Sequence, residues 1–205
     1  MDGTSGKGMR FDPAIHHRRS IRLKDYDYSQ TGAYFVTLCT QSRAFLFGEI
    51  MDGKMCLNDV GRMIQSVWDE LPQHYPGIVI DAFVVMPNHI HGILVLTLVG
   101  AGPCACPSAR VEGQPQGVAP TMLLSDVVHS FKSFTTTRYR QGVTRKGWPA
   151  FAGRLWQRNY YEHIIRNEDE LNGIRPYIDD NRLRWEMDRE NPAAQMRKGE
   201  EAWQV

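Results

Sequence analysis

Residues 78–96 read IVIDAFVVMPNHIHGILVL and contain two apolar, β-branched runs separated by Pro87-Asn88. Such runs favour β-strands, and so short a connection joins strands that run antiparallel. Few polar residues interrupt either run, so we expect the hairpin at 78–86 and 89–96 to be a central, buried pair rather than an exposed edge. This hairpin is the starting point for the fold.

The segments before and after the hairpin predict the remaining elements. Aromatic and β-branched runs favour strands, and apolar residues at helical spacing favour helices. The expected strands lie at 33–41, 45–50 and 154–165, and the expected helices at 58–74, 124–139 and 168–184. Asn58 is a suitable N-cap, whereas Gly173 and Pro176 interrupt the last helix near its start. The order predicts an α+β, ferredoxin-like fold (β-α-β-β-α-β), in which helices pack on one face of an antiparallel sheet and a C-terminal helix follows.

The length of 205 residues allows one domain with a hydrophobic core, which we expect at residues 32–185. Three less ordered segments are expected beside it: a flexible basic arm at 1–31, a flexible insertion at 99–120 and a polar, loosely held C-terminal tail at 186–205. The insertion is dominated by Gly, Pro, Ala and Ser, which cannot bury enough apolar surface to offset its conformational entropy.

The composition argues against a membrane-spanning or disulfide-rich class. Hydrophobic residues make up 42% of the chain and charged residues 23%, as in ordinary globular proteins. No apolar run approaches the roughly 18 residues that a membrane span needs, and the charged residues near the start do not make a signal peptide, so we expect a cytoplasmic protein. The four cysteines lack paired spacing and are expected to be reduced, and the Cys104-x-Cys106 pair is not expected to bind zinc.

The net charge of +1 is an average that hides cationic clusters. Two groups stand out: Arg18, Arg19, Arg22 and Lys24 in the N-terminal arm, and Lys132, Arg138 and Arg158 in the later segments. Guanidinium groups match phosphate oxygens, and neutralising phosphates releases counterions. These side chains are therefore candidate nucleic-acid contacts, and a mixed-charge soluble surface is the alternative interpretation.

His89 and His91 are two residues apart on a predicted strand, so both side chains emerge on one face while Ile90 points to the other. Two neighbouring imidazoles are a metal-ligand arrangement, and burying them without partners would leave polar groups unsatisfied. Structural histidines with bonded nitrogens are the alternative. A metal-dependent hydrolase is a further alternative, although the additional Asp or His ligands of such a motif are absent from 92–96.

The string VVMPNHIHGI at 84–93 closely resembles the HUH motif of single-tyrosine transposases, particularly the REP-associated tyrosine transposases and their insertion-sequence relatives. Ile90 stands for the bulky apolar U of that motif. The resemblance covers about residues 18–185, and further segments similar to the family follow in order at 32–38, 58–68, 124–134 and 155–166. It implies a metal-dependent single-strand DNA endonuclease and strand transferase that acts through a 5′-phosphotyrosine intermediate with Mg²⁺ or Mn²⁺.

The resemblance also assigns the nucleophile, because in the family it lies on a helix after the last strand in a pattern similar to Tyr-Ile-x-x-Asn. Here this is Tyr177 to Asn181, which makes Tyr177 the nucleophile of a catalytic helix and Asn181 the third metal ligand beside His89 and His91. A spacing of four places both side chains on one helix face. Arg182 stands where a proline is common in the family, so the local geometry departs from the pattern.

Two rival tyrosines, Tyr160 and Tyr161, lie in the predicted strand 154–165, where neighbours point to opposite faces and one of them is expected in the core. Trp156 or Tyr161 could stack on unpaired bases, with core packing as the alternative. His129 and His163 are expected as surface, DNA-facing or supporting groups rather than as ligands.

The partner that the resemblance implies is single-stranded DNA folded into a hairpin, a REP-like imperfect palindrome, in a cytoplasmic, nucleoid-associated setting without membrane contact. The protein could act as a monomer or a homodimer. A domesticated protein that binds hairpins without cutting them is the alternative function. A replication initiator or relaxase is disfavoured because those usually carry further domains.

Overall fold

The structure is a computed structural model, and it describes residues 31–97 and 123–194. The predicted arm with Arg18, Arg19 and Arg22, the predicted insertion with Cys104 and Cys106, and residues 195–205 of the predicted tail lie outside the described residues. Within the described ranges, no helix is both long enough and apolar enough to cross a membrane.

Six strands and several helices make up the described chain. The strands are β1 (Gly32–Cys39), β2 (Gly48–Met51), β3 (Lys54–Leu57), β4 (Ile78–Val85), β5 (His89–Leu96) and β6 (Tyr161–Ile165). The α-helices are α1 (Asp59–Asp69), α2 (Leu71–His74), α3 (Leu124–Lys146) and α4 (Glu168–Asp179). Two 3₁₀ segments, η1 (Gln41–Arg43) and η2 (Asn181–Met187), follow β1 and α4.

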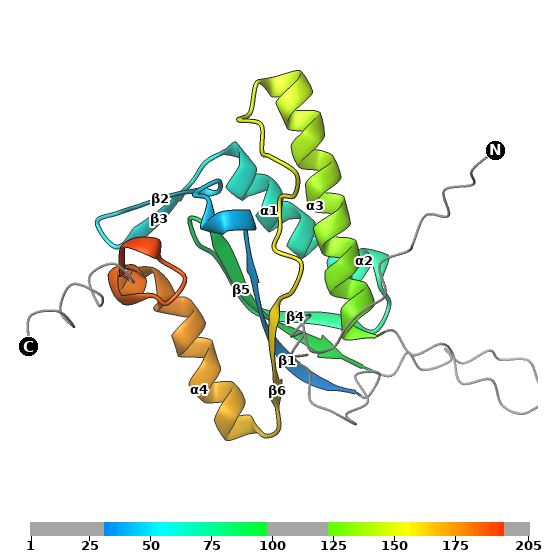
Figure 1. Cartoon of the computed structure of the whole chain (residues 1–205). Helices are drawn as coiled ribbons and strands as arrows, with labels where there is room; N and C mark the ends of the chain where they lie inside the picture. The colour runs from blue at the N-terminus through cyan, green and yellow to red at the C-terminus, as the bar shows by residue number, and fades with distance from the viewer. Residues whose placement is uncertain (1–30, 98–122, 195–205) are drawn as a thin grey trace, which may run out of the picture.

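The main sheet has the strand order β4-β5-β1-β6, and every neighbouring pair is antiparallel. The chain crosses from β1 through α1 to β4, returns in β5 by the hairpin, and crosses again through α3 to β6 (Figure 1). This is the ferredoxin-like arrangement, so the predicted α+β fold class is confirmed. The hairpin β4–β5 spans the predicted residues, and β5 is a central strand of the sheet.

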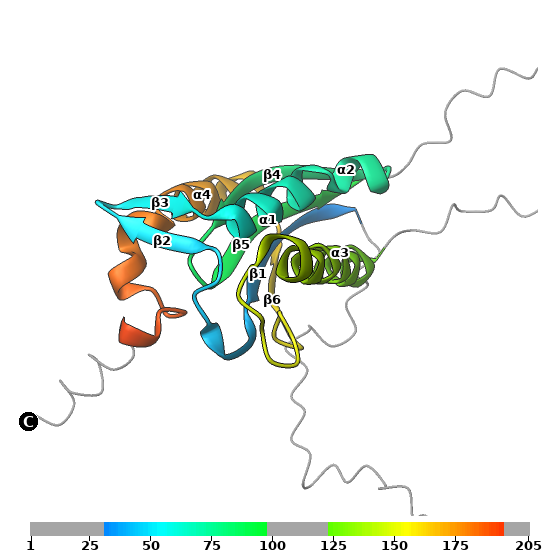
Figure 2. The same ribbon diagram turned by 90° about the horizontal axis from the view of Figure 1, so that it is seen from above.

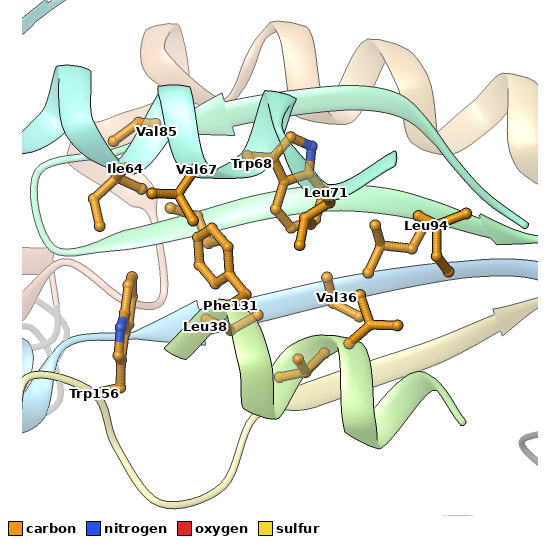
Figure 3. Packing of buried hydrophobic residues seen from close by; sticks show 14 of the residues in the cluster. Val36, Leu38, Ile64, Val67, Trp68, Leu71, Val85, Leu94, Phe131 and Trp156 are labelled. Atoms are coloured by element: carbon orange, nitrogen blue, oxygen red, sulfur yellow. The ribbon is translucent and has the colours of Figure 1, made fainter. Parts of the chain in front are cut away.

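Both faces of the sheet are covered, because alternate residues of its central strands point to different helices. On one face, Val36, Leu38 and Leu94 pack against α1 and α3 through Trp68 and Phe131 (Figure 3). On the other face a smaller cluster joins the sheet to α4: Phe35, Ile93, Ile165 and Ile178. The helix α4 therefore covers the face that α1 and α3 leave open (Figure 1).

Two predicted helices have different bounds in the structure. Asn58 caps α1 as expected, since its side chain accepts a hydrogen bond from the Gly61 amide at 2.9 Å, but the predicted helix 58–74 is divided into α1 and α2. The helix α3 continues past its predicted end at 139, because Thr135 and Thr136 donate their hydroxyls to carbonyls of the preceding turn and remain helical. It ends where Gly147 adopts a φ of +67°, the left-handed conformation that suits glycine.

The predicted strand 154–165 is wrong for its first half, since β6 begins at Tyr161. Residues 154–160 form a loop across the end of β1, where Thr40 forms an isolated bridge with Trp156. The ammonium group of Lys132 donates to the carbonyls of residues 157, 158 and 159 at 2.9, 3.4 and 3.3 Å. A lysine, rather than a strand partner, therefore satisfies these three backbone oxygens, whereas the Leu155 carbonyl accepts from the Gln41 amide at 2.8 Å.

The segment after β1 forms a hairpin that the sequence analysis missed in part. The expected strand at 45–50 is β2, shifted to Gly48–Met51, and it pairs with β3 through a turn at Asp52-Gly53. Both turn residues have positive φ, 50° and 68°, as a two-residue hairpin turn requires. This hairpin lies beside η2, away from the main sheet (Figure 2).

The end of the chain differs most from expectation. The predicted helix 168–184 stops at Asp179 and continues as the 3₁₀ segment η2, so Tyr177 and Asn181 lie in consecutive elements. Residues 188–194 are not loosely held, because Glu190 and Asn191 are buried. The Glu190 carbonyl accepts a hydrogen bond from the Asn88 side chain at 2.8 Å, which ties this segment to the β4–β5 hairpin.

Gly92 in the HIHG string should be essential for stability. A Cβ there would lie 2.4 Å from Trp68 Cζ2, and Trp68 is fixed by stacking on Phe83 with ring centroids 4.3 Å apart. We expect Gly92→Ala to destabilise the fold by about 1–3 kcal/mol, lowering the melting temperature by roughly 2–4 °C per kcal/mol. In the control Gly173→Ala, no described atom lies within 4 Å of the new Cβ, and the helix should gain up to about 1 kcal/mol. Equal melting temperatures for both variants would contradict this account of the packing.

Candidate metal and nucleophile site

The histidine pair lies on β5 at one end of the sheet, on the face covered by α4. His89 and His91 are 0% and 3% exposed, and the register places Cys39 opposite His89 and Thr37 opposite His91. Ile90 points to the opposite core, as the alternation of the strand predicts. The two imidazoles therefore share one buried face.

The imidazoles point their Nε2 atoms at one another, 3.0 Å apart. His89 Nε2 also lies 3.8 Å from Asp188 Oδ2, and the potential ligand atoms of these three residues all lie within 4.8 Å of one another. The outer ring nitrogens are held by protein groups, since Nδ1 of His89 is 2.8 Å from Asn88 Oδ1 and Nδ1 of His91 is 2.8 Å from Thr37 Oγ1. Ligand-type atoms converge while the outer atoms are fixed, which is typical of metal sites.

Asn181 belongs to the same cluster. It is 2% exposed, and its Oδ1 atom has no hydrogen-bond partner within residues 31–97 and 123–194. Burial raises the pKa of Tyr177 and of Asp188, and a hydrogen bond from the Asn181 side chain to each of them opposes this rise. The side-chain nitrogen of Asn181 therefore donates hydrogen bonds to these neighbours. Its buried side-chain oxygen has no such partner among the described residues, and a cation would supply one.

The electrostatics keep both histidines neutral. Burial lowers the pKa of His91 to about 3, an effect that the nearby Glu190 opposes. Burial, together with the neighbouring His91 and Arg43, holds the pKa of His89 well below its usual value. A neutral imidazole has a free lone pair on one nitrogen, which is the form that binds metals.

Tyr177 opens into a cleft beside the histidines. Its ring centroid lies 5.5 Å from that of His91 and 6.0 Å from that of Phe35. The cleft has a volume of about 320 Å³ and is lined by Phe35, Thr37, His91, Tyr161, Tyr177, Asp188, Arg189 and Glu190. Burial and the Asp188 carboxylate raise the pKa of Tyr177, so its phenol is protonated near neutral pH.

The neighbouring tyrosines have different surroundings, since Tyr160 ends the 154–160 loop and Tyr161 begins β6. Tyr160 packs against the main core. Tyr161 is 42% exposed, close to the 41% of Tyr177, and lines the same cleft. Trp156 is buried and donates its indole N–H to Thr135 Oγ1 at 2.8 Å, so the base-stacking interpretation of Trp156 is wrong and core packing is correct.

The three cationic residues named from the later segments lie apart from the cleft. Arg138 forms a two-bond ion pair with Glu70 at 3.0 and 2.5 Å, which connects α3 to the start of α2. Lys132 is engaged by the loop carbonyls, and burial lowers its pKa to about 8. Arg158 is exposed, and it lines a groove between α3 and the 153–158 loop with three further basic side chains that reach solvent, His129, Arg140 and Arg154. His163, in contrast, contacts the Glu170 carboxylate at 2.5 Å.

Asp188 and Glu190 are site residues that sequence reasoning missed, because they were placed in the predicted tail. Glu190 accepts hydrogen bonds from Arg43 at 2.9 Å and from the Cys39 thiol at 3.3 Å. Burial, reinforced by this carboxylate, raises the pKa of the Cys39 thiol to about 12. No spacing relates 188–190 to the histidines, since a 3₁₀ segment and a bend bring them back to the sheet.

The chain was compared with known proteins in sequence and in structure. No family model matches the chain. An uncharacterised protein of Haemophilus influenzae is 41% identical over 181 residues, which are 87% of this chain and 96% of that protein. A solved structure of a REP-associated tyrosine transposase bound to a REP hairpin is 20% identical, covers 80% of this chain and 73% of its own, and has a TM-score of 0.51.

The sheet order, the helices on both faces and the likeness in structure show that this chain has the fold of the REP-associated tyrosine transposases. A candidate transposase of Deinococcus radiodurans is also similar, at 17% identity and a TM-score of 0.44, over 78% of this chain and 95% of its own. By its sequence, the chain belongs to the same family as the Haemophilus influenzae protein.

The stability that the protein gains from the ion pair between α4 and β4 should depend on pH. Arg175 on α4 donates to both oxygens of Asp81 on β4, at 2.9 and 2.7 Å, and these bonds hold the pKa of Asp81 below its usual value. A lowered carboxyl pKa contributes stability that is present above the unfolded value near 3.9 and is lost as the pH falls through the folded value.

Asp81→Asn should therefore lower the melting temperature slightly at pH 7, and its difference from wild type should shrink as the pH falls below about 4. The control Asp179→Asn removes an exposed carboxylate at the C-terminal end of α4, where a negative charge is unfavourable, and should not lower it. A difference that stays constant from pH 7 to below pH 4 would contradict the role of this ion pair.

Proposed function

We propose that this protein is a metal-dependent single-strand DNA endonuclease and strand transferase, of the transposase type, that acts on hairpin DNA with Tyr177 as its nucleophile. One observation carries the proposal: Tyr177 opens into the same cleft as His91, whose Nε2 atom lies 3.0 Å from that of the buried His89. The fold of the REP-associated tyrosine transposases supports it.

The residues that would hold the metal are His89 and His91 through Nε2, Asn181 through Oδ1, and Asp188 through its carboxylate. The fit rests on the unpartnered, buried Oδ1 of Asn181 and on the neutral state of both imidazoles. Such a mixed set of nitrogen and oxygen ligands suits Mg²⁺ or Mn²⁺. When bound, the ion would polarise the scissile phosphate and orient it for in-line attack.

Two residues of the chain favour the ionised form of the nucleophile. Tyr177 is protonated near neutral pH, and the hydrogen bond from Asn181 and the charge of Arg189 act against this by lowering its pKa. Attack would form a bond between Tyr177 Oη and the 5′-phosphate, break the bond to the 3′ oxygen and leave a free 3′-OH. Because the phosphotyrosine keeps the energy of the phosphodiester, a 3′-OH could reverse the step and join strands without ATP.

The solved REP-associated transposase is bound to a REP hairpin, and a folded single strand is accordingly the proposed substrate here. The basic groove with Arg158 offers exposed cations for phosphates, and Lys132 would support its loop from beneath. Arg138 is assigned a structural role, since Glu70 neutralises it.

Tyr177→Phe removes one oxygen and keeps the ring packed near Phe35, so the protein should fold and bind hairpin DNA but form no covalent adduct. Tyr161→Phe is the matched control, because Tyr161 lines the same cleft with a similar exposure, and Tyr160→Phe tests a partly buried neighbour. The measurement is a denaturing gel with labelled hairpin DNA and Mn²⁺, followed by mass spectrometry of the phosphotyrosyl peptide. An adduct that persists in Tyr177→Phe and disappears in Tyr161→Phe would transfer the role to Tyr161.

His89→Ala and His91→Ala should each abolish cleavage while hairpin binding persists, because phosphate contacts that position DNA do not depend on the metal ligands. His74→Ala is the control, since His74 is exposed and lies on α2, outside the cleft. Cleavage and mobility shift are measured on the same oligonucleotides. Metal-dependent cleavage within about threefold of wild type in either ligand variant would contradict the metal site, since loss of a ligand should cost far more.

A further inference from the structure

The Pro87-Asn88 turn is clamped by backbone hydrogen bonds. The Pro87 carbonyl accepts from the amides of Leu46 and Phe47 at 2.9 and 3.1 Å, and the Asn88 carbonyl accepts from the Thr40 amide at 2.8 Å. The Asn88 side chain, which extends from this turn, is fully buried. The turn thus holds a polar side chain in one place beside the first histidine.

The orientation of the Asn88 amide follows from two carbonyl groups. Its Nδ2 atom lies 3.2 Å from the Arg43 carbonyl and 2.8 Å from the Glu190 carbonyl. Carbonyl oxygens only accept hydrogen bonds, so the atom that faces them must carry protons. A reversed amide would put Oδ1 against two oxygens with no proton between them, and its cost in this buried place would be high.

The orientation of Asn88 in turn determines where His89 carries its proton. Oδ1 of Asn88 faces Nδ1 of His89 at 2.8 Å, and an amide oxygen only accepts. His89 must therefore carry its proton on Nδ1. In the neutral ring, Nε2 then has a free lone pair, directed at the centre of the proposed metal site.

His91 stands in a different situation. Its Nε2 lies 3.0 Å from the unprotonated Nε2 of His89, a contact that is a hydrogen bond only if His91 donates. His91 Nδ1 then accepts from Thr37 Oγ1 at 2.8 Å. A threonine hydroxyl can also accept, so Thr37 allows His91 either tautomer, whereas Asn88 allows His89 one.

We infer that Asn88 is a positioning residue that fixes the tautomer of His89, and that His91 changes tautomer when metal binds. In the metal-free protein His91 carries its proton on Nε2. When a metal is bound, His91 would carry its proton on Nδ1 and donate it to Thr37, which would leave the Nε2 lone pairs of both histidines available to the ion. Both rings stay neutral throughout. The second part rests on the proposed function, and the first does not.

The test is nuclear magnetic resonance of the full chain with ¹⁵N-labelled histidine, in which long-range couplings distinguish the two neutral tautomers. Metal-free wild-type protein should show Nδ1–H at His89 and Nε2–H at His91. Saturating Mg²⁺, which is diamagnetic, should convert His91 to Nδ1–H and leave His89 unchanged. Nε2–H at His89 in the metal-free protein would overturn the inference, whatever a cleavage assay gives.

Variants separate positioning from stability. Asn88→Ala should give mixed tautomers at His89 and raise the Kd for Mn²⁺ about 10- to 100-fold. Asn88→Asp keeps an oxygen toward His89 and loses the amide donors to Arg43 and Glu190, so the Nδ1–H form should persist while the melting temperature falls. An unchanged tautomer in folded Asn88→Ala would overturn the role of Asn88. If that variant does not fold, the wild-type spectrum still tests the inference, because it shows which nitrogen of His89 carries the proton.

Thr37→Val removes the hydroxyl and keeps the branched shape. It should leave His89 as in wild type and weaken Mn²⁺ binding, because metal-bound His91 would have no acceptor for Nδ1–H. Wild-type affinity for Mn²⁺ in this variant would overturn the proposed change of tautomer at His91. If the wild-type protein bound neither Mg²⁺ nor Mn²⁺, the proposed function and the change of tautomer would both fail, and Nδ1–H at His89 would still support the role of Asn88.

Discussion

The need to satisfy buried polar atoms is the constraint on which this structure depends. Two imidazoles lie on a central strand where neither can reach water, and each ring nitrogen must find a partner within the protein. The two Nε2 atoms face each other at 3.0 Å, and the outer ring nitrogens are held by Asn88 from the adjoining turn and by Thr37 from the neighbouring strand. The fold of the surrounding chain places these partner atoms beside the imidazoles.

The covered sheet makes this arrangement possible. Because β1 and β5 are buried on both faces, one face can carry the main core while the other carries the histidines and Thr37. Trp68 occupies the space that Gly92 leaves open, so the strand that carries the histidines is held tightly from behind. The helix α4 then covers the polar face through a small apolar cluster, the Arg175–Asp81 ion pair and the contact of Glu170 with His163. The packed core thus supports the strand on the face opposite the imidazoles, and α4 carries Tyr177 to the face on which they lie.

The sequence predicted the parts of the fold and site that follow from local periodicity. Residues two apart on a strand must share a face, which placed His89 with His91. Tyr160 and Tyr161 do have different surroundings, but Tyr160 precedes β6 and does not alternate with Tyr161 on a strand. Capping chemistry likewise located Asn58. The metal and nucleophile roles themselves remain predictions.

What the sequence did not predict depends on contacts between distant segments. Leu155 and Trp156 have the composition of a strand, but they pack into the core from a loop whose carbonyls are bound by Lys132. Asp188 reaches the histidines through a 3₁₀ segment and a bend, which no periodic pattern indicates. The Asp52-Gly53 turn was a readable hairpin signal that was overlooked.

The hydrogen bond between the Cys39 thiol and the Glu190 carboxylate joins residues that are 151 positions apart. A chain emerging from the ribosome presents β1 and the histidines long before it presents α4 and the residues that follow it. Contacts of such large separation form only after most of the loop entropy between them has been lost. The complete cluster of potential ligands therefore forms only after residues 188–190 have been synthesised and have folded back onto the sheet, long after the histidines are made.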